Sequence, residues 1–262
     1  MAFGQRPSHI IKTKTGPDDP ELLGTLQEAL GQADPVDLIT VADELAERHD
    51  RFANYLGEPA TIQSLTQDDL DWIAGSVTVA RRHATTLAEY LAQHNITVVT
   101  HELLHGNNQA AVRVAGFVAR LHDLDPRLRL ELATGLLHYT FPDNHWLWTR
   151  WLWDITAHTG ILPLLAGSVH NLLADDVAEG YVKVGHVTAM SMRFAEGTGL
   201  LTPELTEHPR RRPFAADAFL ACAYSIYLYG VTSWRLSREF NRLLPTLPNM
   251  MRRLLGLPKA GH

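Results

Sequence analysis

The chain has 262 residues, of which 45% are hydrophobic and 20% charged, and its formal net charge is −6. This composition is typical of a globular domain with a substantial core, and the acidic balance argues against a nucleic-acid partner. The polar start of the chain lacks the apolar segment of a secretory signal. The single cysteine, Cys222, excludes an intramolecular disulfide, and we expect a cytoplasmic protein.

Helix start signals recur along the chain. Asp-Pro pairs at 19–20, 34–35 and 125–126 and a capping box at 66–69 each precede an amphipathic stretch. Residues 95–99 are the only candidate strand, and they lead into the sequence THELLH. The longest nearly uncharged run, 214–230, is short and contains Asp217, so it predicts a buried helix rather than a membrane span. Predicted helices cover about 20–31, 35–56, 67–94, 108–122, 126–139, 144–159, 163–173, 175–194, 215–229 and 232–244.

Neither internal repeats nor long linkers interrupt this pattern. We therefore expect a flexible N-terminal arm at 1–17 and one all-α domain at 18–262, a bundle of about ten helices. The basic run at 210–212 lies between two prolines and predicts a solvated loop. Cys222 lies in an apolar helical run, where we expect it to be buried.

The motif His101-Glu102-Leu103-Leu104-His105 has the spacing of a zinc hydrolase, in which two histidines bind the metal and the glutamate activates water. Against this, the glycine and asparagines at 106–108 would end the helix directly after the second ligand. Glu102-x-x-His105 could instead be half of a di-iron carboxylate site, although the chain has no second Glu-x-x-His. Carboxylates for such a site could come from Glu89, Asp154 and Glu179.

A second candidate region lies at 175–203. A helix here would place one stripe of side chains ahead of the turn formed by Gly197, Thr198 and Gly199. This stretch resembles the heme-ligand segment of the tryptophan 2,3-dioxygenase superfamily, and residues 98–104 are similar to the segment that carries its distal histidine. The resemblance covers about 30 residues. The stripe consists of Glu179, Lys183, His186, Met190 and Arg193.

The short chain and the shortened loop after the glycine-threonine-glycine sequence resemble most the heme-dependent L-tyrosine hydroxylases. This resemblance implies a dioxygenase-like helical bundle, heme b with iron bound by His186, and hydrogen peroxide as co-substrate. It also implies hydroxylation of L-tyrosine to 3,4-dihydroxyphenylalanine in natural-product biosynthesis. A homo-oligomer is possible, and a tryptophan or indole dioxygenase is the nearest alternative.

The resemblance also suggests roles for single residues. Proton transfer to peroxide would fall to a distal histidine, with His101, His105 and His83 as candidates in that order. The substrate carboxylate would be bound by Arg193 or Arg150. Thr198 and Gly199 would complete the substrate site, and Trp146, Trp153 and Phe194 would form walls of the heme slot.

Each of these residues has a simpler structural interpretation. The glycine-threonine-glycine turn can be an ordinary helix stop, and Arg150 can form a surface ion pair with Asp154. The tryptophans can be core residues, and histidines near helix ends can cap carbonyl groups. A non-enzymatic helical binding protein and a cofactor-free cyclase or lyase therefore remain open alternatives.

Overall fold

The computed structural model describes residues 20–77, 84–93, 96–228 and 246–258. Thirteen α-helices and two short 3-10 helices form within these ranges, and no β-strand does. This confirms the predicted all-α, single-domain fold. Within the same ranges, no helix has both the length and the apolar character needed to cross a membrane.

Six predicted helices are recovered to within about two residues at each end, namely those that correspond to α1, α2, α7, α8, α10 and α12. The helices are α1 Pro20–Leu30, α2 Pro35–Leu56, α3 Pro59–Ile62, α4 Gln67–Val77, α5 Ala84–Gln93, α6 Thr97–His105, α7 Ala110–Arg120, α8 Pro126–Thr140, α9 Ile161–Leu165, η2 Val169–Asn171, α10 Val177–Glu196, α11 Pro203–Thr206, η3 Arg212–Phe214, α12 Ala215–Leu228 and α14 Leu247–Leu254.

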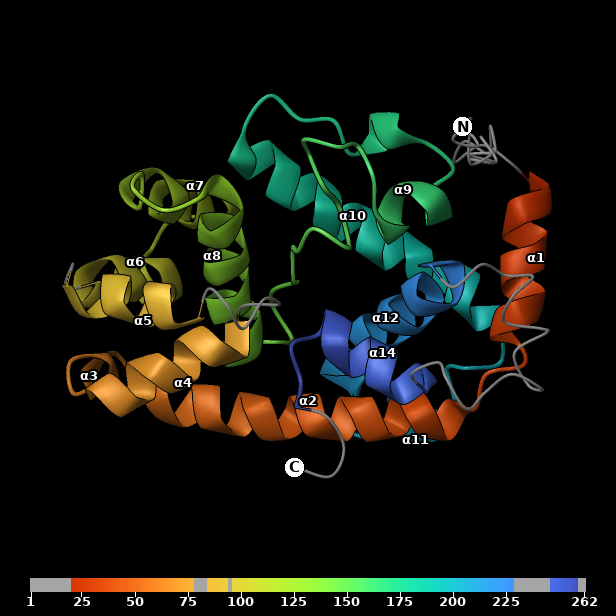
Figure 1. The fold of residues 1–262 in the computed structure, drawn as a ribbon, viewed down its shortest axis with the longest axis horizontal. Helices are drawn as coiled ribbons and strands as arrows, with labels where there is room; N and C mark the ends of the chain where they lie inside the picture. Colours follow the sequence, from red (N-terminus) through yellow and green to blue (C-terminus); the bar gives the residue numbers. More distant parts are fainter. Residues whose placement is uncertain (1–19, 78–83, 94–95, 229–245, 259–262) are drawn as a thin grey trace, which may run out of the picture.

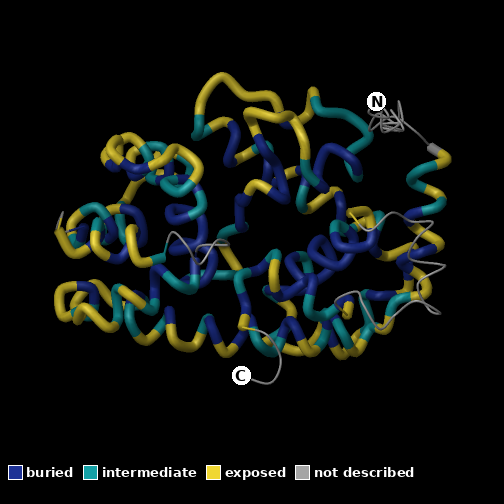
Figure 2. Tube along the Cα trace, viewed as in Figure 1, coloured by how far each residue is buried: buried dark blue, intermediate teal, exposed yellow. Residues whose placement is uncertain are grey.

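The long helix α2 runs along one side of the molecule and supports both halves of the fold (Figure 1). At one end α3 to α6 gather around α8, and at the other end α12 and α14 pack against α2 and each other. Helix α10 packs on α7, α9 and α12 and so joins the two groups. Most of α8 and α12 is buried (Figure 2), because these two helices lie between the others.

Local capping explains why several predicted boundaries hold. The Asp34 carboxylate accepts a hydrogen bond from the backbone N–H of Val36 at the start of α2, and Asp125 does the same for Arg127 at the start of α8. At α4, the backbone N–H of Thr66 donates to the Asp69 carboxylate, and that of Asp69 donates to the Thr66 hydroxyl. These contacts lie within four residues and can therefore be predicted from sequence.

The basic run at 210–212 lies in an exposed turn, as predicted, but its arginines are not free in solvent. Each of its three arginines forms an ion pair with an acidic side chain far away in the sequence, and the Arg211 guanidinium contacts both carboxylate oxygens of its partner at 2.7 and 3.0 Å. The run therefore attaches the start of α12 to α2 and to the end of α8. The pairs are Arg210–Asp50, Arg211–Asp43 and Arg212–Asp143.

Three predicted elements are wrong. The helix predicted over 163–173 is replaced by α9 and η2, with non-helical residues 166–168 between them. Residues 97–99, placed in a strand by their β-branched side chains, instead form the first turn of α6, so THELLH is helical throughout. The tryptophan-rich segment expected as a helix over 144–159 is irregular, because its backbone turns around the side chain of Asp154. The predicted arm at 1–17, the candidate His83 and the predicted helix at 232–244 lie outside the described residues. Cys222 is fully buried, as expected.

The tryptophan segment packs on two glycines of α10. A Cβ atom on Gly185 would lie 2.2 Å from the Trp146 indole, and one on Gly180 would lie 2.5 Å from Trp148. Trp146 also donates a hydrogen bond from its Nε1 to the carbonyl of Tyr181 at 2.7 Å, and the two rings stack with centroids 4.7 Å apart. Because these two glycines have no side chain, α10 leaves room for the two indoles.

We expect Gly185→Ala to lower the free energy of unfolding by about 2 kcal/mol, because the added methyl group displaces a packed indole. Gly116→Ala is the matched control, since a Cβ on this α7 glycine meets no atom within 4 Å. That change should stabilise the protein by about 0.5–1 kcal/mol. Urea denaturation of both variants checks the prediction, and equal effects of the two substitutions would contradict it.

Candidate functional site

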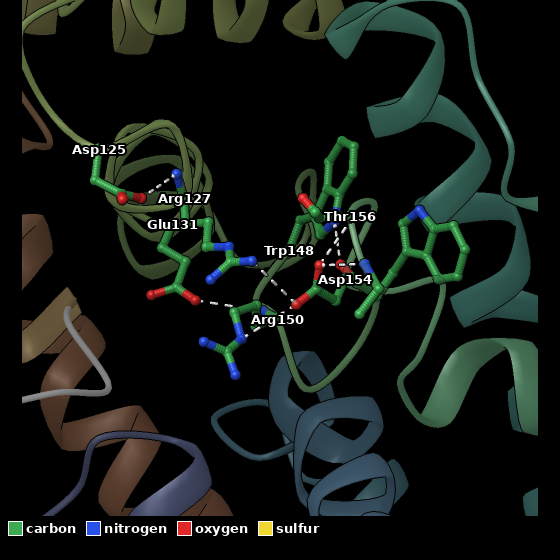
Figure 3. A network of polar contacts seen from close by, with 9 residues as sticks. Asp125, Arg127, Glu131, Trp148, Arg150, Asp154 and Thr156 are labelled. Atoms are coloured by element: carbon green, nitrogen blue, oxygen red, sulfur yellow. Dashed lines mark hydrogen bonds and ion pairs between the residues drawn. The ribbon is translucent and has the colours of Figure 1, made fainter.

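A small, open hollow with a cavity volume of about 60 Å³ lies between the first turns of α8 and the irregular segment that follows Leu147. Its walls combine two indole rings with four charged side chains, so it offers both an apolar surface and specific polar contacts. Figure 3 shows the polar network at this place. The lining residues are Pro126, Arg127, Leu130, Glu131, Trp148, Thr149, Arg150, Trp153, Asp154, Ile155 and Thr156.

Asp154 organises the irregular side of the hollow. Its carboxylate accepts hydrogen bonds from the backbone N–H groups of Thr156 at 2.9 Å and Ala157 at 3.0 Å. The same carboxylate lies 3.3 Å from Arg150 Nε and 3.9 Å from a terminal nitrogen of Arg127 (Figure 3). Burial raises the pKa of Asp154, but the two N–H groups and the two guanidinium groups outweigh that effect and lower it. The carboxylate therefore stays charged and positions both arginines.

Glu131, one turn after Arg127 on α8, contributes a second carboxylate to the hollow. It accepts one hydrogen bond, from the backbone N–H of Arg150 at 3.2 Å (Figure 3). Burial raises its pKa, and the N–H group and the charge of Arg150 only partly oppose that shift. A carboxyl group with a raised pKa beside a hollow is a common feature of ligand sites.

Two further polar atoms of the hollow have no hydrogen-bond partner among the described residues. They are the hydroxyl of Thr149 and the indole Nε1 of Trp153, and both residues are only 2–3% exposed. Buried polar groups are rarely left unsatisfied, since each costs about 1–3 kcal/mol. A bound molecule or ordered water that supplies a hydrogen-bond acceptor would satisfy the indole.

The structure brings together three of the residues singled out in the sequence, Arg150, Trp153 and Asp154. The alternative structural role of Arg150, an ion pair with Asp154, is also observed. Sequence reasoning missed Arg127 and Glu131, although their four-residue spacing on a predicted helix places them on one face.

The structure places His186 and Arg193 elsewhere, on an exposed side of α10. Glu179, the nearest carboxylate of the predicted stripe, is already paired with Lys183 at 2.6 Å and accepts a hydrogen bond from the backbone N–H of Asp175. Neither His186 nor Arg193 lines the hollow beside α8.

The glycine-threonine-glycine turn ends α10. The hydroxyl of Thr198 donates to the carbonyl of Ala195 at 2.7 Å, and Gly199 adopts a φ of 76° that favours glycine. Thr198 is buried, so its hydroxyl is committed to the helix end rather than presented to a substrate. The observed contacts match the simpler interpretation of this motif.

The side chains of the zinc-like motif on α6, residues 101–105, contact different partners and do not converge on one point. Glu102 forms an ion pair with Arg120 of α7, and His105 makes a hydrogen bond through Nε2 to the carbonyl of Leu56 at 3.0 Å. The His101 and His105 rings lie 5.6 Å apart. Over the described ranges, no three histidine, cysteine or acidic side chains are close enough to form a metal site.

The side chains assigned to the heme do not enclose one slot in the described part of the chain. Trp146 stacks on Tyr181, Trp153 lines the hollow beside Trp148, and Phe194 packs against the core, whereas His186 is exposed. These residues therefore do not fit a porphyrin site, and we derive no reaction step through heme. Comparisons of this chain with protein-family models, with curated proteins and with solved structures found no match.

Proposed function

We propose that this chain binds a small aromatic amino acid in the tryptophan-walled hollow, as an enzyme acting on that class of substrate. The observation that supports the proposal is the combination of the Arg127 and Arg150 guanidinium groups with the Glu131 carboxyl around two indole walls. A zwitterion needs one cation for its carboxylate and one anion for its ammonium, and this hollow offers both.

In this arrangement Arg150, whose side chain is 60% exposed, keeps terminal nitrogens free to bind the substrate carboxylate. Glu131 accepts the ammonium, and the substrate's positive charge would oppose the raised pKa of this carboxyl group. Trp148 and Trp153 contact the aromatic ring.

Three ligands that differ in one charged group test the proposal, with affinities measured by isothermal titration calorimetry. Arg150→Gln should weaken L-tyrosine and 3-(4-hydroxyphenyl)propionate about tenfold and leave tyramine, which lacks a carboxylate, unchanged. Glu131→Gln should weaken L-tyrosine and tyramine about tenfold and leave the propionate unchanged. Uniform losses for all three ligands in either variant, or no binding to the wild type, would contradict the assignment.

Heme- and peroxide-dependent hydroxylation of L-tyrosine is the reaction that the sequence resemblance favours, and it is tested separately. Heme bound through His186 would give protein expressed with a heme precursor a Soret band at about 400 nm that His186→Ala removes. Because His186 is exposed, we expect the wild-type protein to lack this band. A colourless wild-type protein would eliminate the heme proposal and leave the amino-acid site to be judged on the titrations alone.

A further inference from the structure

A second hollow, with a cavity volume of about 370 Å³, lies between α6 and α7 at one end of the molecule (Figure 1). Each helix contributes one face to it, with lining positions three or four residues apart, and residues 106–108 after α6 complete the wall. We call this space the α6–α7 hollow. Its volume is sufficient for a small organic ligand.

The side chain of Arg113 is fixed at this hollow by its neighbours. Its Nη1 donates a hydrogen bond to the carbonyl of Leu103 near the end of α6. Its stem passes close to Gly106, since a Cβ on that glycine would lie 3.2 Å from Arg113 Cδ. Glu102, the acidic residue of the lining, pairs with Arg120 instead. Arg113 therefore offers a positioned positive charge to a ligand.

The guanidinium group of Arg113 has hydrogen-bonding capacity to spare. Its Nε is buried and has no hydrogen-bond partner among the described residues. Burial also lowers the pKa of Arg113, because the charged form has lost part of its hydration. A carboxylate is the planar anion that a guanidinium binds through parallel hydrogen bonds. A carboxylate in the hollow would thus replace the lost hydration.

The middle of the hollow is apolar and open. Leu103 and Phe117 form its buried side, and Val112, which is 51% exposed, lies at its edge. Gly116 lies inside α7 and also lines the hollow, and a Cβ there would meet no atom within 4 Å. A glycine inside a helix is destabilising relative to alanine, so its position here favours a need for space. An aliphatic group of a ligand fits this space.

Two carboxamides belong to the same wall as Arg113. Asn107 and Asn108 are exposed and follow directly after Gly106. A carboxamide donates and accepts hydrogen bonds, so it can pair with a peptide group, which does the same. A fatty acid would provide the carboxylate and the aliphatic group but would make no use of these amides. The combination therefore favours a peptide.

We propose that the α6–α7 hollow binds the C-terminal end of a peptide whose last residue is aliphatic. The terminal carboxylate binds Arg113, and the peptide group before it pairs with the carboxamides of Asn107 and Asn108. The last side chain occupies the space beside Gly116 and Phe117. This site shares no lining residue with the tryptophan-walled hollow and does not depend on the function proposed for it.

Isothermal titration calorimetry on the full chain tests this inference with four probes. N-acetyl-alanyl-leucine should bind about tenfold more tightly than its C-terminal amide, which has no charge for the guanidinium. It should also bind about tenfold more tightly than N-acetyl-alanyl-glycine, which has no side chain to bury. 4-Methylpentanoate keeps the carboxylate and the aliphatic group but has no peptide group, so it should bind about fivefold more weakly.

Each comparison can overturn the proposal. Equal affinities of the acid and the amide would show that no carboxylate is recognised, and equal affinities of the leucine and glycine peptides would remove the aliphatic site. If 4-methylpentanoate binds as tightly as the peptide, the ligand is a simple carboxylate and the peptide assignment is wrong. No binding of N-acetyl-alanyl-leucine to the wild type would also refute the site.

Two variants locate the site. Arg113→Gln should weaken N-acetyl-alanyl-leucine about tenfold and change the affinity of its amide less than about twofold, because only the acid carries the charge. Gly116→Leu fills open space in the hollow and should weaken the acid about tenfold. Gly24→Leu on α1 is the matched control and should change the affinity less than about twofold. This glycine is exposed, a Cβ there also meets no atom within 4 Å, and it does not line the hollow. If Arg113→Gln does not fold, Gly116→Leu decides alone, and an unchanged affinity in that variant would refute the site.

Discussion

Asp217→Asn should lower the free energy of unfolding by about 3 kcal/mol at pH 6, because it breaks a buried ion pair. His138 and Asp217 lie 2.8 Å apart, and their side chains are only 3% and 8% exposed. The other ring nitrogen of His138 bonds to the carbonyl of His145 at 2.8 Å. With acceptors at both nitrogens, the ring is held as an imidazolium that joins α8, α12 and residue 145.

The pH dependence of this effect has a definite sign. Burial alone would lower the pKa of His138, but the charge and hydrogen bond of Asp217 and the carbonyl of His145 together raise it. The pair's contribution to stability is therefore complete below the unfolded value near about 6.5 and is lost as pH rises through the folded pKa. In Asp217→Asn burial dominates and reverses this slope, so the difference between the two proteins should shrink from pH 6 to pH 8.

Urea denaturation at pH 6, 7 and 8 measures this difference directly. Asp143→Asn is a suitable control, since its ion pair with Arg212 is 57–61% exposed and should contribute less than about 0.5 kcal/mol at any of these pH values. A difference between wild type and Asp217→Asn that grows with pH would show that His138 is neutral in the folded protein.

The elements that could be predicted from sequence are those fixed by nearby residues. Asp34 and Asp125 cap helices through contacts two residues away, so the pattern around each was sufficient. The strand prediction at 95–99 failed because β-branched residues have only a weak intrinsic preference, which packing of α6 against α7 and α8 overrides. The helix prediction for the tryptophan segment failed because two of its indoles pack against Gly180 and Gly185, which lie thirty or more residues away in the sequence.

The same distinction applies to the candidate site. The pairing of Arg150 with Asp154 was predicted from a four-residue spacing, and the pair exists even though the segment is not helical. Glu131 could not be placed opposite Arg150 from sequence, because the two belong to separate elements that meet only in the folded protein. The contact of His138 with Asp217 could not be predicted either, because the two residues lie 79 positions apart in the chain.

Asp154→Ala should lower the free energy of unfolding by about 2 kcal/mol, because it removes the acceptor around which the segment turns. Asp154→Asn keeps one oxygen for the N–H groups of Thr156 and Ala157 and should cost about half as much. Arg127→Gln should cost less than about 0.5 kcal/mol, since this arginine is 47% exposed and lies 3.9 Å from the carboxylate. The series therefore separates the capping of the backbone from the ion pairs.

The loss of stability at acid pH independently measures the contribution of the Asp154 carboxylate. Because the folded pKa of Asp154 is lowered, its contribution to stability is present above the unfolded value near about 3.9 and is lost as pH falls through the folded pKa. The Asp154→Ala variant should therefore lose less stability than wild type between pH 5 and pH 2.

Asp154 also positions Arg150, so the affinity for L-tyrosine should fall in Asp154→Ala. It should persist in Gly116→Ala, because Gly116 does not line the tryptophan-walled hollow. Unchanged affinity in Asp154→Ala would show that the hollow does not bind the amino acid through this arginine.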